Sequence, residues 1–379
     1  MATKNRGVLV ATAQTVVDAM ETELDQISPT VIDQIGLVDT IGERKASALD
    51  MTWLRQYRMW SEWIGEREVN QNREAFMARM FTRKFQRTVR IPLEDIEDGI
   101  EANFNPAGEA AGVREGYENL LEQEHQAYFE HALDEKYHGG ETTGAYGKKM
   151  FVGSLDGEPL LSDTHPYYDV IEYDPDAPRG ERMRLEGGGE YSNLVNLQLT
   201  RENLWEVVRM FRTMKHYTGR PANMGQPTTL IVPPALEEQA RVILEKTVIL
   251  TEGSTGAAAT DNIVPNMELE VNNYLQDKIN ADFNFEGTSY TNQEVDISKM
   301  WYVANTRQDR KPFIHWNRKQ PQVQRPVGTP DLSSDNPAEG AVDYLTFKDD
   351  AAHVGARARF GVSFGVPQVI LGSLGGQTL

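Results

Sequence analysis

The sequence contains one motif that is typical of serine hydrolases. Residues 361–365 read GVSFG, which matches the G-x-S-x-G nucleophile elbow, and residues 138–140 read HGG, which is similar to the oxyanion turn of some esterases. An elbow needs a strand, a sharp turn and a helix, and its acid and histidine follow the serine in the chain. No Asp, Glu or His follows Ser363, and apolar residues alternate around it. We therefore predict that Ser363 lies inside a strand and does no chemistry.

A second candidate site lies around Asp163 and His165. Several acidic residues follow them and could supply oxygen ligands to a hard cation: Asp169, Glu172, Asp174 and Asp176. The spacing and the positioned glycine of a calcium-binding loop are absent, so we favour a solvated acidic loop. A metal-dependent hydrolase using Asp163 and His165 remains the alternative enzymatic function.

Two other patterns that would indicate an enzyme are incomplete. The glycines at 187–189 lack the Lys-Ser/Thr that completes a phosphate loop, and no histidines form an H-E-x-x-H pair. No nucleophile, base and oxyanion donor come together in the sequence. We predict no enzyme, no cofactor and no metal.

One basic segment is interleaved with aromatic residues, as in strips that bind single-stranded nucleic acid. It comprises Arg307, Arg310, Lys311, Arg318, Lys319 and Arg325, with Phe313, His315 and Trp316 between them. The whole chain, however, has a formal net charge of -19, which repels a phosphate backbone. We therefore favour a strip of salt bridges between subunits.

Composition limits the class of protein further. The chain has 379 residues, enough for two or three domains, and no cysteine, so it forms no disulfide or thiolate site. It has no secretory signal and no apolar run long enough to cross a membrane. We expect a soluble protein that is intracellular at synthesis, with no membrane partner and no cleaved N-terminal pro-segment.

The elements in the first third of the chain follow from the apolar periodicity. Residues 8–26 predict an amphipathic helix on an N-terminal arm, which docks on its own subunit or on another. Residues 81–91 alternate apolar and basic side chains until Pro92, which predicts a two-faced strand. Residues 110–137 predict one long amphipathic helix.

The stretch 53–94 can form an extended two-stranded loop that ends in charged residues. The four aromatic residues at its start, Trp53, Tyr57, Trp60 and Trp63, fit ordinary core and a contact between subunits equally well. Its strand carries a basic run that precedes an acidic run: Arg83, Lys84, Arg87 and Arg90, then Glu94, Asp95, Glu97 and Asp98. These runs could pair head to tail between copies; a solvated charged face is the alternative.

Further elements are expected downstream. We predict a helix over 201–217 capped by Thr200, and a strand at 229–232 followed by a helix that ends at Lys246. Strands are expected at 269–275 and 300–304, an extended segment at 313–324, and a sheet-closing strand within 354–371. Residues 167–190 and 251–262 are expected as loops, and 327–340 as a linker.

An ordered set of short segments resembles the Mu-like major head protein (gpT) family of tailed phages and prophages. The segments are WIGER at 63–67, FQRTVRIPLEDIED at 85–98, LSDTHP at 161–166, SN at 192–193, LT at 199–200, LIVPPALEEQA at 230–240, WYV at 301–303 and KPF at 311–313. The resemblance extends over about residues 50 to 371. The acidic segment 167–190 and the N-terminal arm lie outside the resemblance.

The resemblance implies an α+β fold, the Hong-Kong-97-type phage capsid fold. It would divide the chain into an N-terminal arm (1–52), an extended loop (53–98), a peripheral domain (99–225) with spine helix 110–137, an axial domain (226–308), returning peripheral strands (309–371) and a flexible tail (372–379).

The resemblance also implies a major capsid protein that assembles into hexamers and pentamers of an icosahedral head around double-stranded DNA. Scaffolding, portal and decoration proteins would be its partners, the virion its location, and the host cytoplasm its place of assembly. A nanocompartment shell is the alternative. Residues expected at intersubunit contacts are Trp60, Trp63, Arg67, Arg83, Arg87, Glu94, Glu97, Arg318 and Lys319.

Overall fold

The structure is a computed structural model that describes fourteen stretches of the chain. They are residues 14–40, 48–54, 74–92, 105–135, 140–143, 149–152, 158–168, 187–214, 226–245, 248–253, 256–261, 267–306, 311–324 and 351–379. Within these stretches no helix combines the length and the apolar content that a membrane crossing requires.

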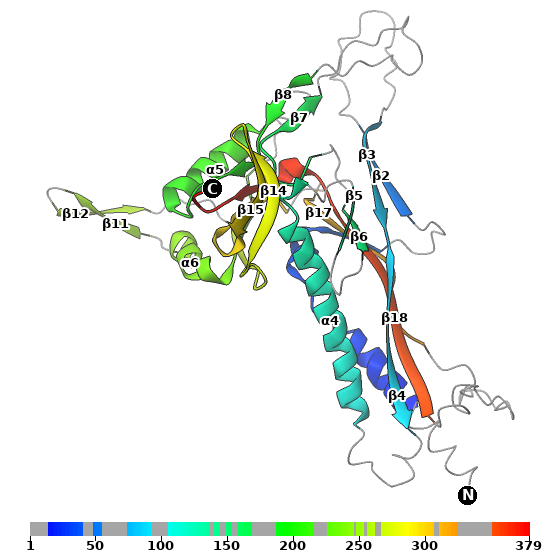
Figure 1. Ribbon diagram of the computed structural model, residues 1–379. Coiled ribbons are helices and arrows are strands. Elements are labelled where there is room, and N and C mark those ends of the chain that lie inside the picture. The colour runs from blue at the N-terminus through cyan, green and yellow to red at the C-terminus, as the bar shows by residue number, and fades with distance from the viewer. Residues whose placement is uncertain are drawn as a thin grey trace, which may run out of the picture.

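A four-stranded sheet and one long helix form the elongated part of the molecule (Figure 1). The sheet has the order β1-β17-β18-β4, with β1 (Leu37–Thr40) parallel to β17 (Phe313–Gln324) and β18 (Ala351–Phe364) antiparallel to both β17 and β4 (Arg83–Pro92). Helix α4 (Pro106–Glu130) runs along this sheet. At about 1.5 Å per residue its 25 residues span about 38 Å.

Apolar side chains join α4 to the sheet. Phe85 and Phe360 stack at 4.6 Å between ring centroids, and Tyr128 and Phe364 meet edge to face at 5.5 Å. The Tyr128 hydroxyl donates to the Val362 carbonyl at 2.6 Å. Such aromatic contacts add to the burial of apolar area, so they fix α4 against the centre of the sheet.

The N-terminal segment docks on its own subunit. Residues 14–24 form a helix whose buried side chains Val16, Val17, Met20 and Leu24 pack on Val89, Ile91, Ala110, Val113 and Val354. Helix α2 (Val31–Ile35) follows, and the Thr30 side chain caps it in a reciprocal capping box with Asp33. The sequence did not decide whether this segment docks on its own subunit or on another. Residues 14–40 dock on their own subunit.

A second body is built on a five-stranded sheet with the order β13-β10-β16-β19-β9. Its strands are β13 (Glu268–Val271), β10 (Thr229–Val232), β16 (Trp301–Ala304), β19 (Ile370–Ser373) and β9 (Leu194–Val195). Helices α5 (Arg201–Thr213) and α6 (Glu237–Glu245) pack on it through Leu204, Val207, Phe211, Ala240 and Ile243. Short 3₁₀ turns η3 (Pro234–Leu236), η4 (Ile297–Lys299) and η5 (Pro367–Val369) connect its elements.

Five two-stranded ribbons complete the described elements. They are β2 (Ala48–Leu54) with β3 (Glu74–Phe81), β5 (Gly140–Thr143) with β6 (Lys149–Val152), β7 (His165–Tyr168) with β8 (Gly187–Tyr191), β11 (Val248–Gly253) with β12 (Gly256–Asp261), and β14 (Lys278–Phe285) with β15 (Thr288–Asp296). In Figure 1 the β11–β12 ribbon projects away from the body that carries α5 and α6.

Several predicted elements are confirmed with shifted bounds. The long helix begins at Pro106, because proline suits the first helical turn, and ends at Glu130. The helix expected over 201–217 ends at Thr213, and the Thr200 hydroxyl accepts from the Asn203 amide as predicted. The strand expected at 269–275 ends at Val271. The linker 327–340 lies outside the described residues.

Other expectations about loops and strand partners were wrong. The strand at 81–91 is present as β4, but it pairs with β18, and β2 pairs with β3. The glycines at 187–189 lie in β8, since glycine, which has no side chain, still forms ladder hydrogen bonds. Residues 248–253 and 256–261 pair as β11 and β12, where a loop was expected over 251–262.

The tail expected to be flexible (372–379) is held by hydrogen bonds. Gly372 and Ser373 end β19, and Leu374 is fully buried. The Gln377 amide donates to the Asn196 side chain at 3.0 Å, and the Gln377 side chain donates to the Asp296 carbonyl at 2.9 Å. Gly375 and Gly376 adopt positive φ, and a Cβ on Gly375 would collide with the Lys299 carbonyl. Glycine therefore allows the chain to turn back onto the body.

Candidate assembly interface

Strand β4 has two chemically different faces. Phe85, Val89 and Ile91 are buried toward α4, whereas Lys84 and Arg90 are exposed on the opposite face. Successive side chains of a strand point to opposite faces, and these five residues follow that alternation. The strand has two faces as predicted, but Arg83 and Arg87, expected to alternate with the apolar residues, lie on the same side as Phe85.

Arg83 is used inside the subunit. Its guanidinium pairs with Glu124 of α4, whose side chain is 2% exposed, and lies 5.2 Å from the centre of the Phe85 ring. Burial lowers the pKa of Arg83 from its usual range, although an arginine stays charged. A buried carboxylate needs a cation beside it, so the structure gives Arg83 an internal partner.

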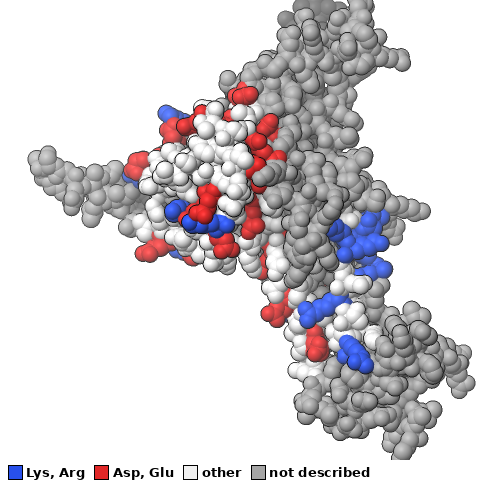
Figure 2. Space-filling view, in the orientation of Figure 1, with Lys and Arg blue, Asp and Glu red and all other residues white. Residues whose placement is uncertain are grey.

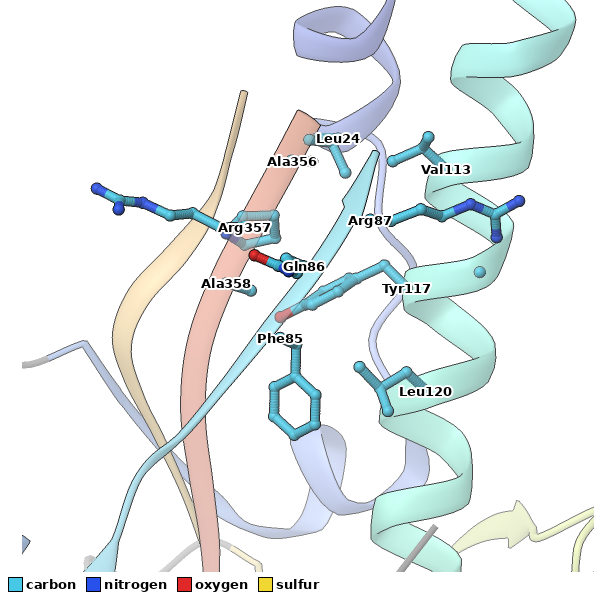
Figure 3. Close-up of a pocket in the computed structure, with 12 residues that line it drawn as sticks. Leu24, Phe85, Gln86, Arg87, Val113, Tyr117, Leu120, Ala356, Arg357 and Ala358 are labelled. Atoms are coloured by element: carbon cyan, nitrogen blue, oxygen red, sulfur yellow. The ribbon is translucent and has the colours of Figure 1, made fainter. Parts of the chain in front are cut away.

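Arg87 lies four residues further along β4 and is exposed. Figure 3 shows its side chain reaching toward α4, where a Cβ on Gly116 would collide with the guanidinium. Gly116 therefore makes room for Arg87 on the surface of the helix. Unlike Arg83, Arg87 presents its charge to solvent.

An apolar groove opens between α4 and the sheet beside Arg87 (Figure 3). Its volume is 210 Å³, and its apolar lining includes Leu24, Phe85, Val113, Tyr117, Leu120, Ala356 and Ala358. Small residues on β18 and Gly116 on α4 leave this space between the two layers. Arg357 points away from the groove, to the outer face of the sheet.

The outer face of the four-stranded sheet carries like charges side by side. Lys84 on β4 lies directly opposite Arg359 on β18, and Arg359 lies directly opposite Lys319 on β17. Burial, followed by the charge of Arg318, lowers the pKa of Arg359. Like charges opposite one another destabilise a sheet, so this row needs negative charge from elsewhere.

Strands β4, β17 and β18 together carry eight arginines and lysines and no aspartate or glutamate. Figure 2 shows Lys and Arg gathered over this elongated part, whereas Asp and Glu predominate over the body that carries α5 and α6. The chain as a whole is strongly acidic, with a net charge of -19. The fold nevertheless gathers basic residues on one part of the molecule and acidic residues on another. We refer to Lys84, Arg318, Lys319, Arg357 and Arg359 as the basic face; Arg87 lies on the other side of β4, toward α4.

The structure describes four of the nine residues expected at intersubunit contacts. Arg83 and Arg87 lie on β4, and Arg318 and Lys319 lie on β17, where both are half-buried. The other five, Trp60, Trp63, Arg67, Glu94 and Glu97, lie outside the described residues.

The described residues that were considered for catalysis form hydrogen bonds with other residues of the chain. Ser363 is buried in β18, as predicted, one residue before the strand ends, and its hydroxyl donates to the Phe364 carbonyl at 3.3 Å. His165 is fully buried, stacks on Tyr191 and hydrogen-bonds Asn193 at 3.1 Å. The Asp163 carboxylate accepts from the Glu286 amide at 2.5 Å. Asp169, Glu172, Asp174, Asp176 and His138 lie outside the described residues.

A polar cluster that the sequence did not predict lies beneath the sheet. The His315 imidazole on β17 meets the Asp33 carboxylate at 2.5 Å, and the His125 imidazole on α4 meets the Thr30 hydroxyl at 2.5 Å. Burial opposes ionisation of Asp33, but His315 and His125 outweigh it and lower its pKa to about 2. Burial, with the charge of His315, lowers the pKa of His125 to about 3. Thr30 and Asp33 are close in the sequence, but His125 and His315 are far from them and from each other, so no local motif signals the cluster.

A family model covers most of the chain. The model of the Mu-like prophage major head subunit gpT matches residues 17–135, 191–275 and 274–378. The match includes most of the N-terminal arm, which lay outside the resemblance, and omits the acidic segment 167–190. A search of curated proteins finds no match.

Several solved structures resemble this chain at low sequence identity. The procapsid of bacteriophage JBD30 is 14% identical, with 98% of this chain and 76% of that chain covered and a TM-score of 0.43. The capsid of the cyanophage P-SCSP1u is 8% identical (92% and 88% covered, TM-score 0.46), and the virus-like particle from Pyrococcus furiosus is 8% identical (95% and 98% covered, TM-score 0.42).

All three TM-scores lie below 0.5, so the assignment rests on the family match. The mixed helices and sheets agree with it, and the predicted α+β fold of phage capsid proteins is confirmed. The family model matches well over half of the residues of this chain, and the protein therefore belongs to the Mu-like prophage major head subunit gpT family.

Proposed function

We propose that this protein is the major capsid subunit of a phage head and builds the shell by contacts between charged and extended parts of neighbouring copies. The observation that carries this function is the family match from residue 17 to residue 378. The subunit would form hexamers and pentamers of an icosahedral shell around double-stranded DNA, without catalysis. Scaffolding, portal and decoration proteins would take part, and assembly would occur in the host cytoplasm before the protein becomes part of the virion.

The distribution of charge supports a specific kind of contact. The basic face places Lys84, Arg359 and Lys319 in one row across three strands that carry no acidic residue. The acidic run that contains Glu94 and Glu97 directly follows β4 in the sequence. We propose that the acidic run of one copy lies on the basic face of the next, because opposite charges fix register and orientation between subunits.

Many such contacts, each weak, add up in a closed shell because every copy is held by several neighbours. Trp60 and Trp63 would provide the apolar anchors, with Arg67 and Arg87 as charged contacts. The β2–β3 ribbon would belong to the extended loop, α4 would be the spine helix of the peripheral domain, and the five-stranded sheet would form most of the axial domain. Arg83 would instead stabilise the subunit itself through Glu124.

The test reverses one exposed charge of β4. Arg87→Glu replaces no buried side chain, so we expect a folded subunit that forms no shells, with particle yield reduced at least tenfold. Sedimentation velocity and negative-stain electron microscopy measure the yield. Arg209→Glu on α5 is the matched control, since Arg209 is exposed and lies far from the basic face in the fold.

A charge swap identifies the partner of Arg87. If the acidic run of a neighbouring copy contacts Arg87, Glu94→Arg or Glu97→Arg combined with Arg87→Glu restores part of the particle yield. Normal shells from Arg87→Glu alone would refute the role of Arg87.

A further inference from the structure

Asp33, His125 and His315 form a compact group of metal-binding side chains inside the subunit. One donor atom from each of the three lies within 4.8 Å of those of the other two. Asp33 comes from α2, His125 from α4 and His315 from β17, so three separate elements meet there. We call these three residues the two-histidine cluster.

The cluster is shielded from solvent. The side chains of His125 and His315 are each no more than 3% exposed, and that of Asp33 is 13% exposed. The two imidazole rings lie edge to face at 5.0 Å between centroids. The three residues are separated by 92 and 190 residues of sequence. Protein interiors consist mainly of apolar side chains, so a buried group of two imidazoles and a carboxylate is unusual.

The hydrogen bonds of the cluster leave polar atoms unsatisfied. The Nδ1 atoms face Asp33 and Thr30, but among the described residues neither Nε2 atom has a hydrogen-bond partner. A buried polar atom without a partner costs about 1–3 kcal/mol. Each ring therefore keeps one nitrogen whose burial no hydrogen bond among the described residues offsets.

The donor set selects a class of metal. Imidazole nitrogens and a carboxylate oxygen are the ligands of Zn²⁺ and related first-row ions, whereas Mg²⁺ and Ca²⁺ prefer oxygen ligands. With zinc–ligand distances of about 2.0–2.1 Å, tetrahedral ligand atoms lie roughly 3.3 Å apart. Donor atoms within 4.8 Å of one another reach that spacing by side-chain movements on the order of 1 Å.

We propose that Asp33, His125 and His315 bind a Zn²⁺ ion, with the Thr30 hydroxyl or a water molecule as the fourth ligand. The ion would replace the hydrogen bond that now joins Asp33 and His315. Each imidazole binds through a nitrogen without a proton, and the ring proton moves to the other ring nitrogen or is released to solvent.

The ion would fasten the N-terminal segment to the rest of the subunit. Residues 30–33 reach the body at this point, through α4 and β17 together. A metal ion there would connect all three elements directly and would stabilise the docked position of the segment. This site is independent of the proposed contacts between copies.

The experiment uses the untagged full-length protein after treatment with a chelator. We expect one equivalent of Co²⁺ to give the visible absorption band of a tetrahedral site, and one equivalent of Zn²⁺ to remove that band and raise Tm by several degrees. Asp33→Asn keeps the size of the side chain but removes the anionic ligand, so both responses should be lost. His353→Gln, which changes a histidine outside the cluster, should keep both.

The proposal is overturned if Co²⁺ gives no stoichiometric band, or if Asp33→Asn and His353→Gln respond to Zn²⁺ as the wild type does. Should Asp33→Asn fail to fold, the wild-type protein decides the question by itself. Metal bound at less than one tenth of an equivalent after exposure to Zn²⁺ and gel filtration would then refute the site.

Discussion

Two arginines on one strand have opposite roles, and their neighbours across the chain decide which. Arg83 meets the buried carboxylate of Glu124, whereas Arg87 lies over Gly116 at the surface of α4. Both occur in the same alternating pattern of apolar and basic residues. The sequence therefore predicted a basic strand but could not separate an internal ion pair from a surface charge.

A histidine at the end of α4 should make stability depend on pH. Burial lowers the pKa of His131 to about 4, whereas an unfolded histidine titrates near 6.5. Between these values the unfolded chain binds the proton more readily than the folded one does, so acid favours unfolding. We expect the free energy of unfolding to fall by about 1–3 kcal/mol as the pH drops from 6.5 to 4.

The measurement is urea unfolding of the wild type and His131→Gln across that pH range. The difference between the two proteins isolates the contribution of His131, since the other titrating groups are shared. This difference should be largest above pH 6.5 and should shrink toward pH 4. A difference that does not change with pH would show that the proton on His131 is not linked to folding.

At the scale of elements, α4 carries glycines at positions where a helix normally loses stability. Gly108, Gly112 and Gly116 recur every four residues along it. A Cβ on Gly112 would meet no atom within 4 Å, whereas one on Gly116 would collide with the Arg87 guanidinium. Gly116 therefore has a packing role, and the structure gives Gly112 none.

This contrast makes a matched pair of substitutions. Gly112→Ala should raise the free energy of unfolding by about 0.5–1 kcal/mol, because alanine favours the helix and restricts the unfolded chain. Gly116→Ala should gain less, since the Arg87 side chain must move. Chemical denaturation measures both; equal gains would mean that Arg87 does not depend on the space above Gly116.

At the scale of the whole molecule, the N-terminal segment completes an apolar core. Its helix covers Val89 and Ile91 of β4, Val113 of α4 and Val354 of β18. The Glu23 carboxylate also accepts from Arg114 at 2.6 Å, and the Ser28 amide donates to Glu118 at 3.0 Å. The segment is thus part of the folded subunit.

Removing residues 1–40 should make the subunit aggregate, because the apolar side chains beneath the segment would face water. Deletion of residues 1–13 is the control, since it retains all of the packing described here. Gel filtration and binding of a hydrophobic dye measure the outcome. A soluble monomer lacking residues 1–40, with unchanged dye binding, would contradict this role for the segment.

Local patterns in the sequence determined much of the secondary structure. The period of two predicted β4, the apolar run 229–232 predicted β10, and Thr200 predicted the start of α5, because each signal is complete within a few residues. The acid-free composition of β4, β17 and β18 was also present in the sequence.

Only the tertiary structure decided which of these elements meet. β4 pairs with β18 across more than 250 residues of sequence, and Asp33 meets His315 across 282. A strand exposes hydrogen-bonding groups that accept many partners, and the choice depends on which apolar faces can be buried together. The basic row and the two-histidine cluster both arise from that choice, so neither could be read from the chain alone.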